Sequence, residues 1–515
     1  MQNKIIQLLT IFVFSFSFSG AVNSAESSTD KSLQVASIFT DHMVLQRDLP
    51  ISVWGKSPAG SKVSVAFSNQ KQMTISDNNG DWKLQLSPLK GSFTPESMTI
   101  SSSHNQIIIL DDIVVGEVWI ASGQSNMQMM INSIKEIKEL RKTAKHIRSF
   151  TVERTVSFKE ETSMQGSWQA DIPDSAIAFS FAYFLQQRAE VPVGIILTAW
   201  GSSSLEAWMP RDLTSELPYF ATIMKEFDSN PHRIGYIDSI LSQPNPWSKK
   251  DDVYLRRQPN ILFNAMMKPI APYTVRGLVW YQGERNTQSM DGLVSTPWFK
   301  NNSGMLKYKE ALQAWIKRYR QEWNNQDMNF LVVMLPRYQK LLASSPTTDV
   351  EHPNAHSWAW MRESQLAAES LKNVSVVNTI DLGNPTNVHP KDKLPIGQRL
   401  AKLAARDTLQ QDIEAQGPVL KNTRVSAGKI TVNFTHSHGL TTTNGEDPSE
   451  FWLANDDQNW LRAKAKIIGN AVELSSDEIS KPLYVRYAFS GAPNVNLINS
   501  AGLPAQPFRT DSFKP

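Results

Sequence analysis

The stretch VVGEVWIASGQSNM, residues 114–127, decides the fold of this chain. Its first part, 114–121, is an apolar run that predicts a buried strand, and a helical pattern begins around Met127. Further apolar runs at 147–152, 193–199, 275–280, 330–335 and 374–380 alternate with helical patterns, the clearest of which extends from Met305 to Trp323. Such alternation predicts an α/β domain whose parallel sheet is covered by helices on both faces.

Regions of a different kind flank this α/β region. Between 34 and 111, short β-prone runs such as Lys62–Phe67 are separated by turn clusters, which predicts an antiparallel β-sandwich domain. From 415 to 515 the pattern returns, for example at Lys429–Phe434, and predicts a C-terminal β domain. The central domain is therefore expected over residues 112–414, and three domains suit a length of 515 residues.

The first 25 residues have the pattern of a secretory signal peptide. Lys4 supplies a positive charge, and a 14-residue apolar stretch at 5–18, diluted by polar residues, is followed by small residues. An uncleaved anchor is the alternative, but it needs about 18 apolar residues, and no later segment reaches that length either. We therefore expect no membrane span and an exported protein, in a bacterial periplasm or outside the cell.

The composition limits the chemistry. The net charge of +3 gives no electrostatic reason to expect nucleic acid or an anionic membrane as a partner. The chain has no cysteine, which excludes disulfides, thiolate catalysis, Cys-ligated zinc and iron–sulfur clusters. Any nucleophile must therefore be an oxygen or a nitrogen. The oligomeric state does not follow from composition.

Ligands bind parallel sheets at the carboxyl ends of the strands, so the residues that follow each run are the candidates for a site. Ser125 follows the first run, at a junction where a hydroxyl is presented and backbone N–H groups can hold an oxyanion. The alternative is that Ser125 merely caps the next helix. Gly201 follows the third run, and a glycine there leaves its N–H open to a ligand.

Polar side chains also follow the fourth and the last runs. Gln282, Glu284 and Arg285 end a buried apolar strand, where polar groups must find partners. His389 lies in the loop after the last run, on the edge of the sheet where Ser125 is expected. A single loop histidine is equally compatible with a structural or solvated role.

Taken together, the four loops resemble the block pattern of the SGNH hydrolases, and specifically of the sialate O-acetylesterase family of carbohydrate esterases. The segments that carry the resemblance are SGQSNM at 122–127, GSSSLEAWM at 201–209, WYQGE at 280–284, and His389-Pro390 followed by Lys393 and Arg399. The flanking segments HMVLQ at 42–46 and VRYA at 485–488 also look like this family. The resemblance favours Ser125 as a nucleophile over a helix cap.

The resemblance implies a flavodoxin-like three-layer core and a serine esterase that removes O-acetyl groups from a sugar. Ser125 would attack the acetyl carbonyl while His389 takes its proton. The backbone N–H groups of Ser125 and Gly201 and the amide of Gln282 would stabilise the oxyanion. Neither a metal nor an organic cofactor is needed. Supporting or substrate-binding roles are expected for Glu284, Arg285, Asn126 and Trp208.

Two departures from the family pattern affect these expectations. Asn387 occupies the position of the usual aspartate, which leaves three interpretations: a Ser–His dyad oriented by Asn387 or a backbone carbonyl, an acid supplied by Asp381 or Asp392, or a decayed catalyst. Arg285 replaces a small serine and would either attract a carboxylate or lie at the surface. Among the tryptophans, those at 119, 280, 315 and 323 are expected in the core, and only Trp200 and Trp208 are candidates for a sugar subsite.

Three functions follow as alternatives. The leading expectation is hydrolysis of 9-O-acetylated sialic acids. The second is hydrolysis of acetylated polysaccharides of the xylan or xyloglucan type. The third is a catalytically silent scaffold that binds glycans.

Overall fold

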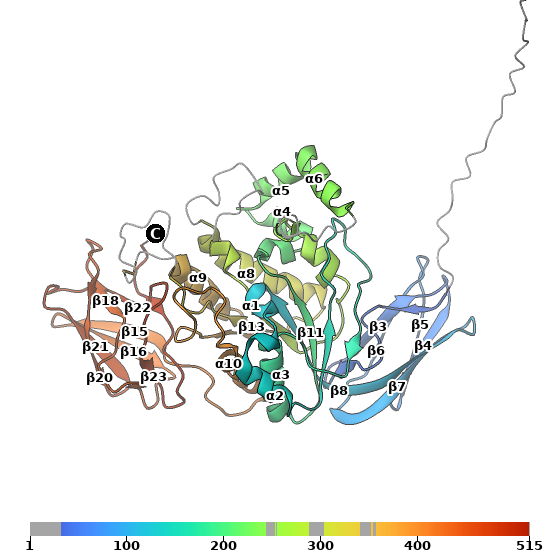
Figure 1. Cartoon of the computed structure of the whole chain (residues 1–515), viewed down its shortest axis with the longest axis horizontal. Coiled ribbons are helices and arrows are strands. Elements are labelled where there is room, and N and C mark those ends of the chain that lie inside the picture. Colours follow the sequence, from blue (N-terminus) through green and yellow to red (C-terminus); the bar gives the residue numbers. More distant parts are fainter. Residues whose placement is uncertain are drawn as a thin grey trace, which may run out of the picture.

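The computed structural model describes residues 32–243, 253, 255–287, 303–339, 352–353 and 357–513 (Figure 1). The expected signal peptide, residues 1–25, lies outside the described residues. Over the described part of the chain, no helix is both long and apolar enough to cross a membrane.

A large mixed sheet forms the centre of the molecule. Its parallel strands are β9 (Ile147–Thr151), β11 (Val193–Ala199), β8 (Ile107–Gly123), β12 (Gly277–Tyr281), β13 (Asn329–Val333) and β14 (Val374–Val377), in that spatial order, with β10 (Trp168–Gln169) antiparallel at the edge. With β9 set aside, the other five parallel strands follow the order 2-1-3-4-5, which is that of flavodoxin-like sheets. Each of the six predicted runs overlaps one strand, so the predicted α/β class is confirmed.

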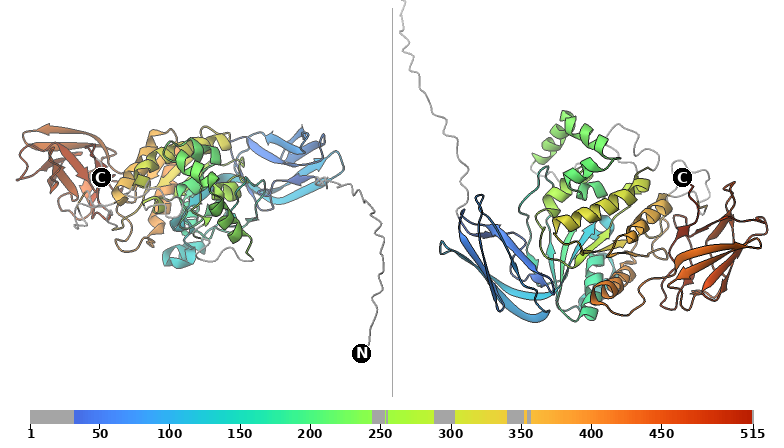
Figure 2. Two further views of the ribbon diagram at one scale, coloured as in Figure 1. Left: turned by 90° about the horizontal axis from the view of Figure 1, so that it is seen from above. Right: turned by 180° about the vertical axis from the view of Figure 1, so that it is seen from behind.

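Helices cover both faces of this sheet. On one face α3 (Ala176–Ala189) packs against α10 (Lys393–Leu409), and on the other α8 (Ser303–Glu322) packs against α9 (Ser357–Leu366) (Figures 1 and 2). The predicted helix at 305–323 is α8, and the apolar side chains at the expected spacing, from Met305 to Trp323, are buried. The remaining elements here are α1 (Ser125–Gln128), η1 (Ile131–Ser133), α2 (Lys135–Arg141), η2 (Leu205–Trp208), α4 (Arg211–Glu216), α5 (Ala221–Ser229), α6 (Pro231–Leu241), η3 (Phe263–Met267), η4 (Arg285–Thr287) and η6 (Ala367–Ser370).

Tryptophans make up much of the core between α8 and the sheet. The ring centroids of Trp280 and Trp315 are 4.5 Å apart. Trp119 is buried against α3, with its ring centroid 5.3 Å from that of Phe181. Trp323 is 6 % exposed. The prediction that these four tryptophans belong to the core is confirmed.

The N-terminal region contains two sheets. One has the order β1 (Gln34–Val35), β3 (Ile51–Lys56), β6 (Asp81–Leu86). The other pairs β5 (Gln70–Ile75), β4 (Lys62–Phe67) and β7 (Ser92–Ser102) with the first part of β8, along which β2 (Val44–Gln46) also runs. The second part of β8 pairs with β11 and β12, so one strand belongs to both regions and crosses the expected boundary between residues 111 and 112.

A buried ion cluster reinforces this connection. Glu117, on β8, has no exposed surface and accepts hydrogen bonds from Arg47 Nε at 2.7 Å and Arg276 Nε at 3.0 Å. Charge-assisted bonds of this kind are strong because both partners are ionised. They tie the N-terminal region to the strand that leads to the candidate site.

The C-terminal region is built of β strands, as expected. One sheet has the strand order β15 (Val419–Ser426), β16 (Lys429–Thr435), β21 (Ala471–Ser475), β20 (Lys464–Ile468). A second has the order β19 (Leu461–Arg462), β18 (Phe451–Ala454), β22 (Tyr484–Tyr487), β24 (Phe508–Arg509). A third pairs β17 (Thr441–Thr442) with β23 (Leu497–Ile498). Buried Arg362 of α9 joins it to the centre, because its guanidinium donates to the carbonyls of Leu335 and Pro336 on one side and of Ser490 and Gly491 on the other.

Candidate active site

The candidate nucleophile lies where β8 ends. Gly123 is the last residue of β8 and has φ +142°, and a Cβ there would lie 2.1 Å from the carbonyl oxygen of Tyr281 on β12. Only glycine fits this approach of the two strands. Ser125 follows as the first residue of α1 and is half-buried. The loops after β8, β11 and β12 therefore meet at the point where the strand order reverses.

Ser125 and His389 are in direct contact. The distance from His389 Nε2 to Ser125 Oγ is 2.8 Å, although the two residues are 264 positions apart in the sequence. This distance is within the range that a general base needs to take a proton from a hydroxyl. The structure thus brings together the two residues on which the expected chemistry depends.

The environment of His389 favours its neutral form. Partial burial and the nearby ammonium of Lys393 both lower the pKa of the imidazole. A carboxylate at the other ring nitrogen would act in the opposite direction. A neutral imidazole at physiological pH is the form that accepts a proton from serine.

Asn126 connects several parts of the site. Its Nδ2 donates to Glu284 Oε1 at 2.5 Å and to the carbonyl of Val388 at 3.0 Å, and its Oδ1 accepts from Lys393 Nζ at 2.6 Å. Because Val388 precedes His389, Asn126 fixes the backbone that carries the base. Asn126, Glu284 and Lys393 are all buried, and burial raises the pKa of Glu284 and lowers that of Lys393 to about 8.

The structure does not support Gln282 as a direct oxyanion donor. Its side chain has no exposed surface, and its Nε2 donates to Gln124 Oε1, the Ser203 carbonyl and Asn286 Oδ1 at 2.8–3.2 Å. An amide nitrogen has only two hydrogens, so these acceptors leave no hydrogen of Gln282 for an oxyanion. Gln282 instead joins the loops that follow β8, β11 and β12.

Gly201 lies next to the serine, but its N–H group is already bonded. A Cβ on Gly201 would lie 3.2 Å from Ser125 Cβ, and the Gly201 N–H donates to Gln128 Oε1 at 2.8 Å. Gln128 is half-buried and stands one helical turn after Ser125 on α1. In this structure the side-chain carbonyl of Gln128 therefore takes the position that an oxyanion bound to Gly201 would occupy.

The candidates for a third catalytic residue have other partners. Asn387 Oδ1 accepts from the backbone N–H of His389 at 2.9 Å, so it holds the loop and not the imidazole. Both oxygens of Asp381 accept from Arg399, at 2.7 and 2.6 Å. Asp392 Oδ2 accepts from the Gly383 N–H. These contacts favour the interpretation of a Ser–His dyad over an acid supplied by Asp381.

Burial contradicts two expected sugar-subsite residues, Trp200 and Trp208, and one of the two roles considered for Arg285. Trp208 has no exposed surface, and its Nε1 donates to Ser203 Oγ, so it cannot stack on a sugar. Trp200 is 3 % exposed and lies under the guanidinium of Arg256. Arg285 is 4 % exposed, which excludes the surface role considered for it.

Sequence reasoning did not assign roles to Gln128 and Lys393. The position of Gln128, three residues after Ser125 on a helix, was the available signal, because residues so spaced share a face. The described residues contain no cluster of three or more His, Asp or Glu side chains arranged for a metal ion.

The fold and the paired serine and histidine are those expected of an ester hydrolase. Residues 115–406, more than half of the chain, match the family model described as carbohydrate esterase, sialic acid-specific acetylesterase. The chain therefore belongs to this family of carbohydrate esterases, as the sequence motifs predicted.

Individual relatives agree with this assignment. Sialate O-acetylesterase of Rattus norvegicus is 25 % identical over 473 residues, covering 83 % of this chain and 84 % of the relative. The protein of that name from Homo sapiens is 23 % identical, with 94 % of each chain covered. The crystal structure of a carbohydrate acetylesterase from Xanthomonas citri superimposes with a TM-score of 0.77 and 28 % identity, over 93 % of this chain and all of that one.

Proposed function

We propose that this protein hydrolyses O-acetyl esters of carbohydrates through a Ser125–His389 dyad on an SGNH-type core. The observation that carries the proposal is the 2.8 Å contact between His389 Nε2 and Ser125 Oγ. Ser125 Oγ attacks the acetyl carbonyl as His389 takes its proton, and the tetrahedral intermediate collapses to acetyl-serine when the sugar oxygen leaves with that proton. Water, deprotonated by His389, then releases acetate and restores Ser125.

The proposed oxyanion donors are the backbone N–H groups of Ser125 and Gly201. Because the Gly201 N–H donates to Gln128 Oε1, the side chain of Gln128 must move away before an ester carbonyl can accept from it. Each donor in such a site contributes about 3 kcal/mol to the stabilisation of the transition state. The free enzyme is thus in a resting state with this donor covered.

For the substrate, 9-O-acetylated sialic acid remains the first candidate, because the family model is described as sialic acid-specific. An acetylated neutral polysaccharide is the second, and the burial of Arg285 favours it. A buried guanidinium is not presented to the carboxylate by which a sialic acid differs from a neutral sugar.

A chromogenic acetate ester tests the chemistry, and product analysis tests the substrate. Hydrolysis by the wild type that Ser125→Ala abolishes supports the proposal, whereas equal rates in both proteins contradict it. Acetate release from acetylated sialic acid is then compared with release from acetylated xylan, and the faster reaction identifies the substrate class. We also propose that the chain is exported, which amino-terminal sequencing of the mature protein tests.

A further inference from the structure

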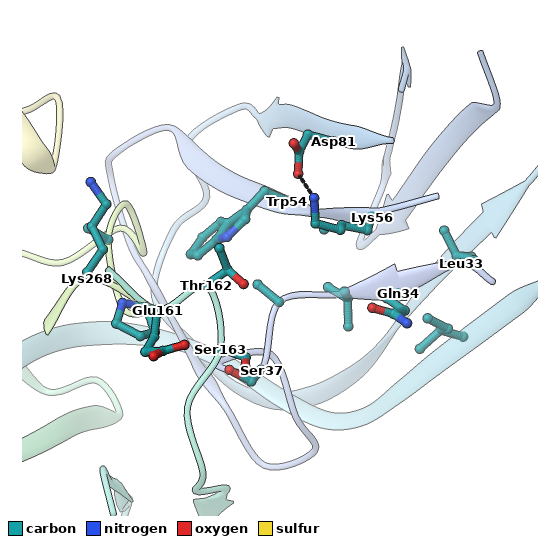
Figure 3. Close-up of a pocket in the computed structure, with 16 residues that line it drawn as sticks. Leu33, Gln34, Ser37, Trp54, Lys56, Asp81, Glu161, Thr162, Ser163 and Lys268 are labelled. Atoms are coloured by element: carbon teal, nitrogen blue, oxygen red, sulfur yellow. Dashed lines mark hydrogen bonds and ion pairs between the residues drawn. The ribbon is translucent and has the colours of Figure 1, made fainter. Parts of the chain in front are cut away.

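A cavity of about 660 Å³ lies apart from the candidate active site, between the N-terminal region and the central domain. Strands β1, β3 and β6 supply one wall, and the loop at 161–163 together with the segment from Lys268 to Ala271 supplies the other (Figure 3). Neither Ser125 nor His389 lines it. Its volume falls within the range of about 300–1,000 Å³ of small-molecule sites, which often lie at domain interfaces.

The lining has an apolar part and a polar part. Trp54 stands in the middle of the wall, and its half-buried ring is held in place by Phe39, whose ring centroid is 4.9 Å away in a T-shaped arrangement (Figure 3). Around it, Gln34, Thr162 and Ser163 offer exposed amide and hydroxyl groups. An aromatic ring beside side chains that both donate and accept hydrogen bonds suits a ligand that has C–H faces and hydroxyl groups.

The lining holds two lysines, Lys56 and Lys268, and two carboxylates, Asp81 and Glu161. Lys56 is paired with Asp81 at 2.6 Å, both within the lining (Figure 3). Lys268, also in the lining, is paired with Glu160 and Glu322, each at 3.0 Å. A ligand carboxylate or phosphate would have to compete with these protein carboxylates for both lysines and would be repelled by Glu161, so the cavity disfavours an anionic ligand.

We propose that this interdomain cavity is a second carbohydrate-binding site, which takes a segment of a neutral polysaccharide against Trp54. The site is separate from the Ser125–His389 dyad, and its binding does not depend on the proposed chemistry. On a long glycan, engagement of this cavity raises the effective concentration of the remaining chain near the protein.

Binding to glycans without acetyl groups tests the proposal independently of catalysis. The full mature chain carrying Ser125→Ala is run in affinity gels that contain xyloglucan, xylan or polysialic acid. We expect retardation by at least one of the two neutral polysaccharides and none by polysialic acid. Trp54→Ala should weaken the retention at least tenfold, as expected for loss of a central aromatic contact.

Two further variants separate the cavity from general effects on folding. Thr162→Trp fills the cavity without removing part of its wall, and it should weaken binding as Trp54→Ala does. Phe93→Ala removes an aromatic side chain that is 45 % exposed on the same N-terminal region but outside the cavity, and it should bind as the parent does. Unchanged retention in both cavity variants, absence of retention by either neutral polysaccharide, or retention by polysialic acid alone would overturn the proposal. If the wild type did not hydrolyse the chromogenic ester, that result would contradict the proposed function and not the proposed binding site.

Discussion

Replacing Gln128 by alanine should improve the binding of an acetyl ester. In the free protein, Gln128 Oε1 accepts from the Gly201 N–H at 2.8 Å, and the ester carbonyl must displace it. A hydrogen bond of this type contributes about 0.5–1.5 kcal/mol net, because water replaces the partner that is lost. At about 1.4 kcal/mol per factor of ten, Gln128→Ala should lower KM about two- to tenfold and leave kcat nearly unchanged.

The assay is steady-state hydrolysis of a chromogenic acetate, with single-turnover kinetics to separate binding from chemistry. Gln128→Glu is the informative partner, because a carboxylate accepts the Gly201 N–H more strongly and should raise KM. Met130→Ala, at a residue 52 % exposed just beyond α1, is the matched control and should have no effect. If Gln128→Ala left KM unchanged, or lowered kcat tenfold or more, the inference that the ester carbonyl displaces Gln128 from the Gly201 N–H would be refuted.

Three other predictions concern the base and its support. Because burial and Lys393 lower the pKa of His389, kcat/KM should stay high to below pH 6.5 and be lost as the pH falls through that lowered pKa. A flat pH profile of kcat/KM down to pH 4 would exclude His389 as the base. Asn387→Asp keeps the acceptor for the backbone N–H of His389 but adds a negative charge, which raises the pKa of the imidazole. The acidic limb of the pH profile should therefore move to higher pH, and an unmoved limb would show that the charge does not affect the imidazole. Asn126→Ala removes the side-chain hydrogen bonds to Glu284 and Lys393, so thermal denaturation should show a loss of about 1–3 kcal/mol, and kcat should fall roughly 10- to 100-fold with a smaller change in KM. An unchanged kcat would contradict its positioning role.

The sequence predicted the features that depend on local periodicity and on the edge of a parallel sheet. The apolar runs mark the strands, and the rule that ligands bind at carboxyl ends of strands places Ser125 and His389 at one edge of the sheet. The same reasoning failed for Trp200, Trp208 and Gln282. Whether a loop side chain faces the pocket or the layer beneath it depends on tertiary packing, which the order of residues along a strand end does not encode.

The hydrogen bond between the Gly201 N–H and Gln128 could not be predicted either, because it joins two segments that follow different strands. Similarly, β8 was expected to begin near residue 114, since the polar pair Asp111 and Asp112 interrupts the apolar pattern. The structure carries the strand through this pair with Asp112 at φ +55°, so the interruption is a local bend and not an end.

Strand β8 runs without a break from the interdomain cavity to the candidate active site. Ile108 lines the interdomain cavity, and Gly123 at the other end of the same strand adjoins the nucleophile. At about 3.3 Å per residue, the fifteen steps between them span at most roughly 50 Å. Because a hydrogen-bonded strand does not stretch, the separation between the two places is fixed, and a glycan that occupies both must be long enough to bridge it. The proposed cavity site and the proposed dyad would then act together only on a glycan of that length or longer.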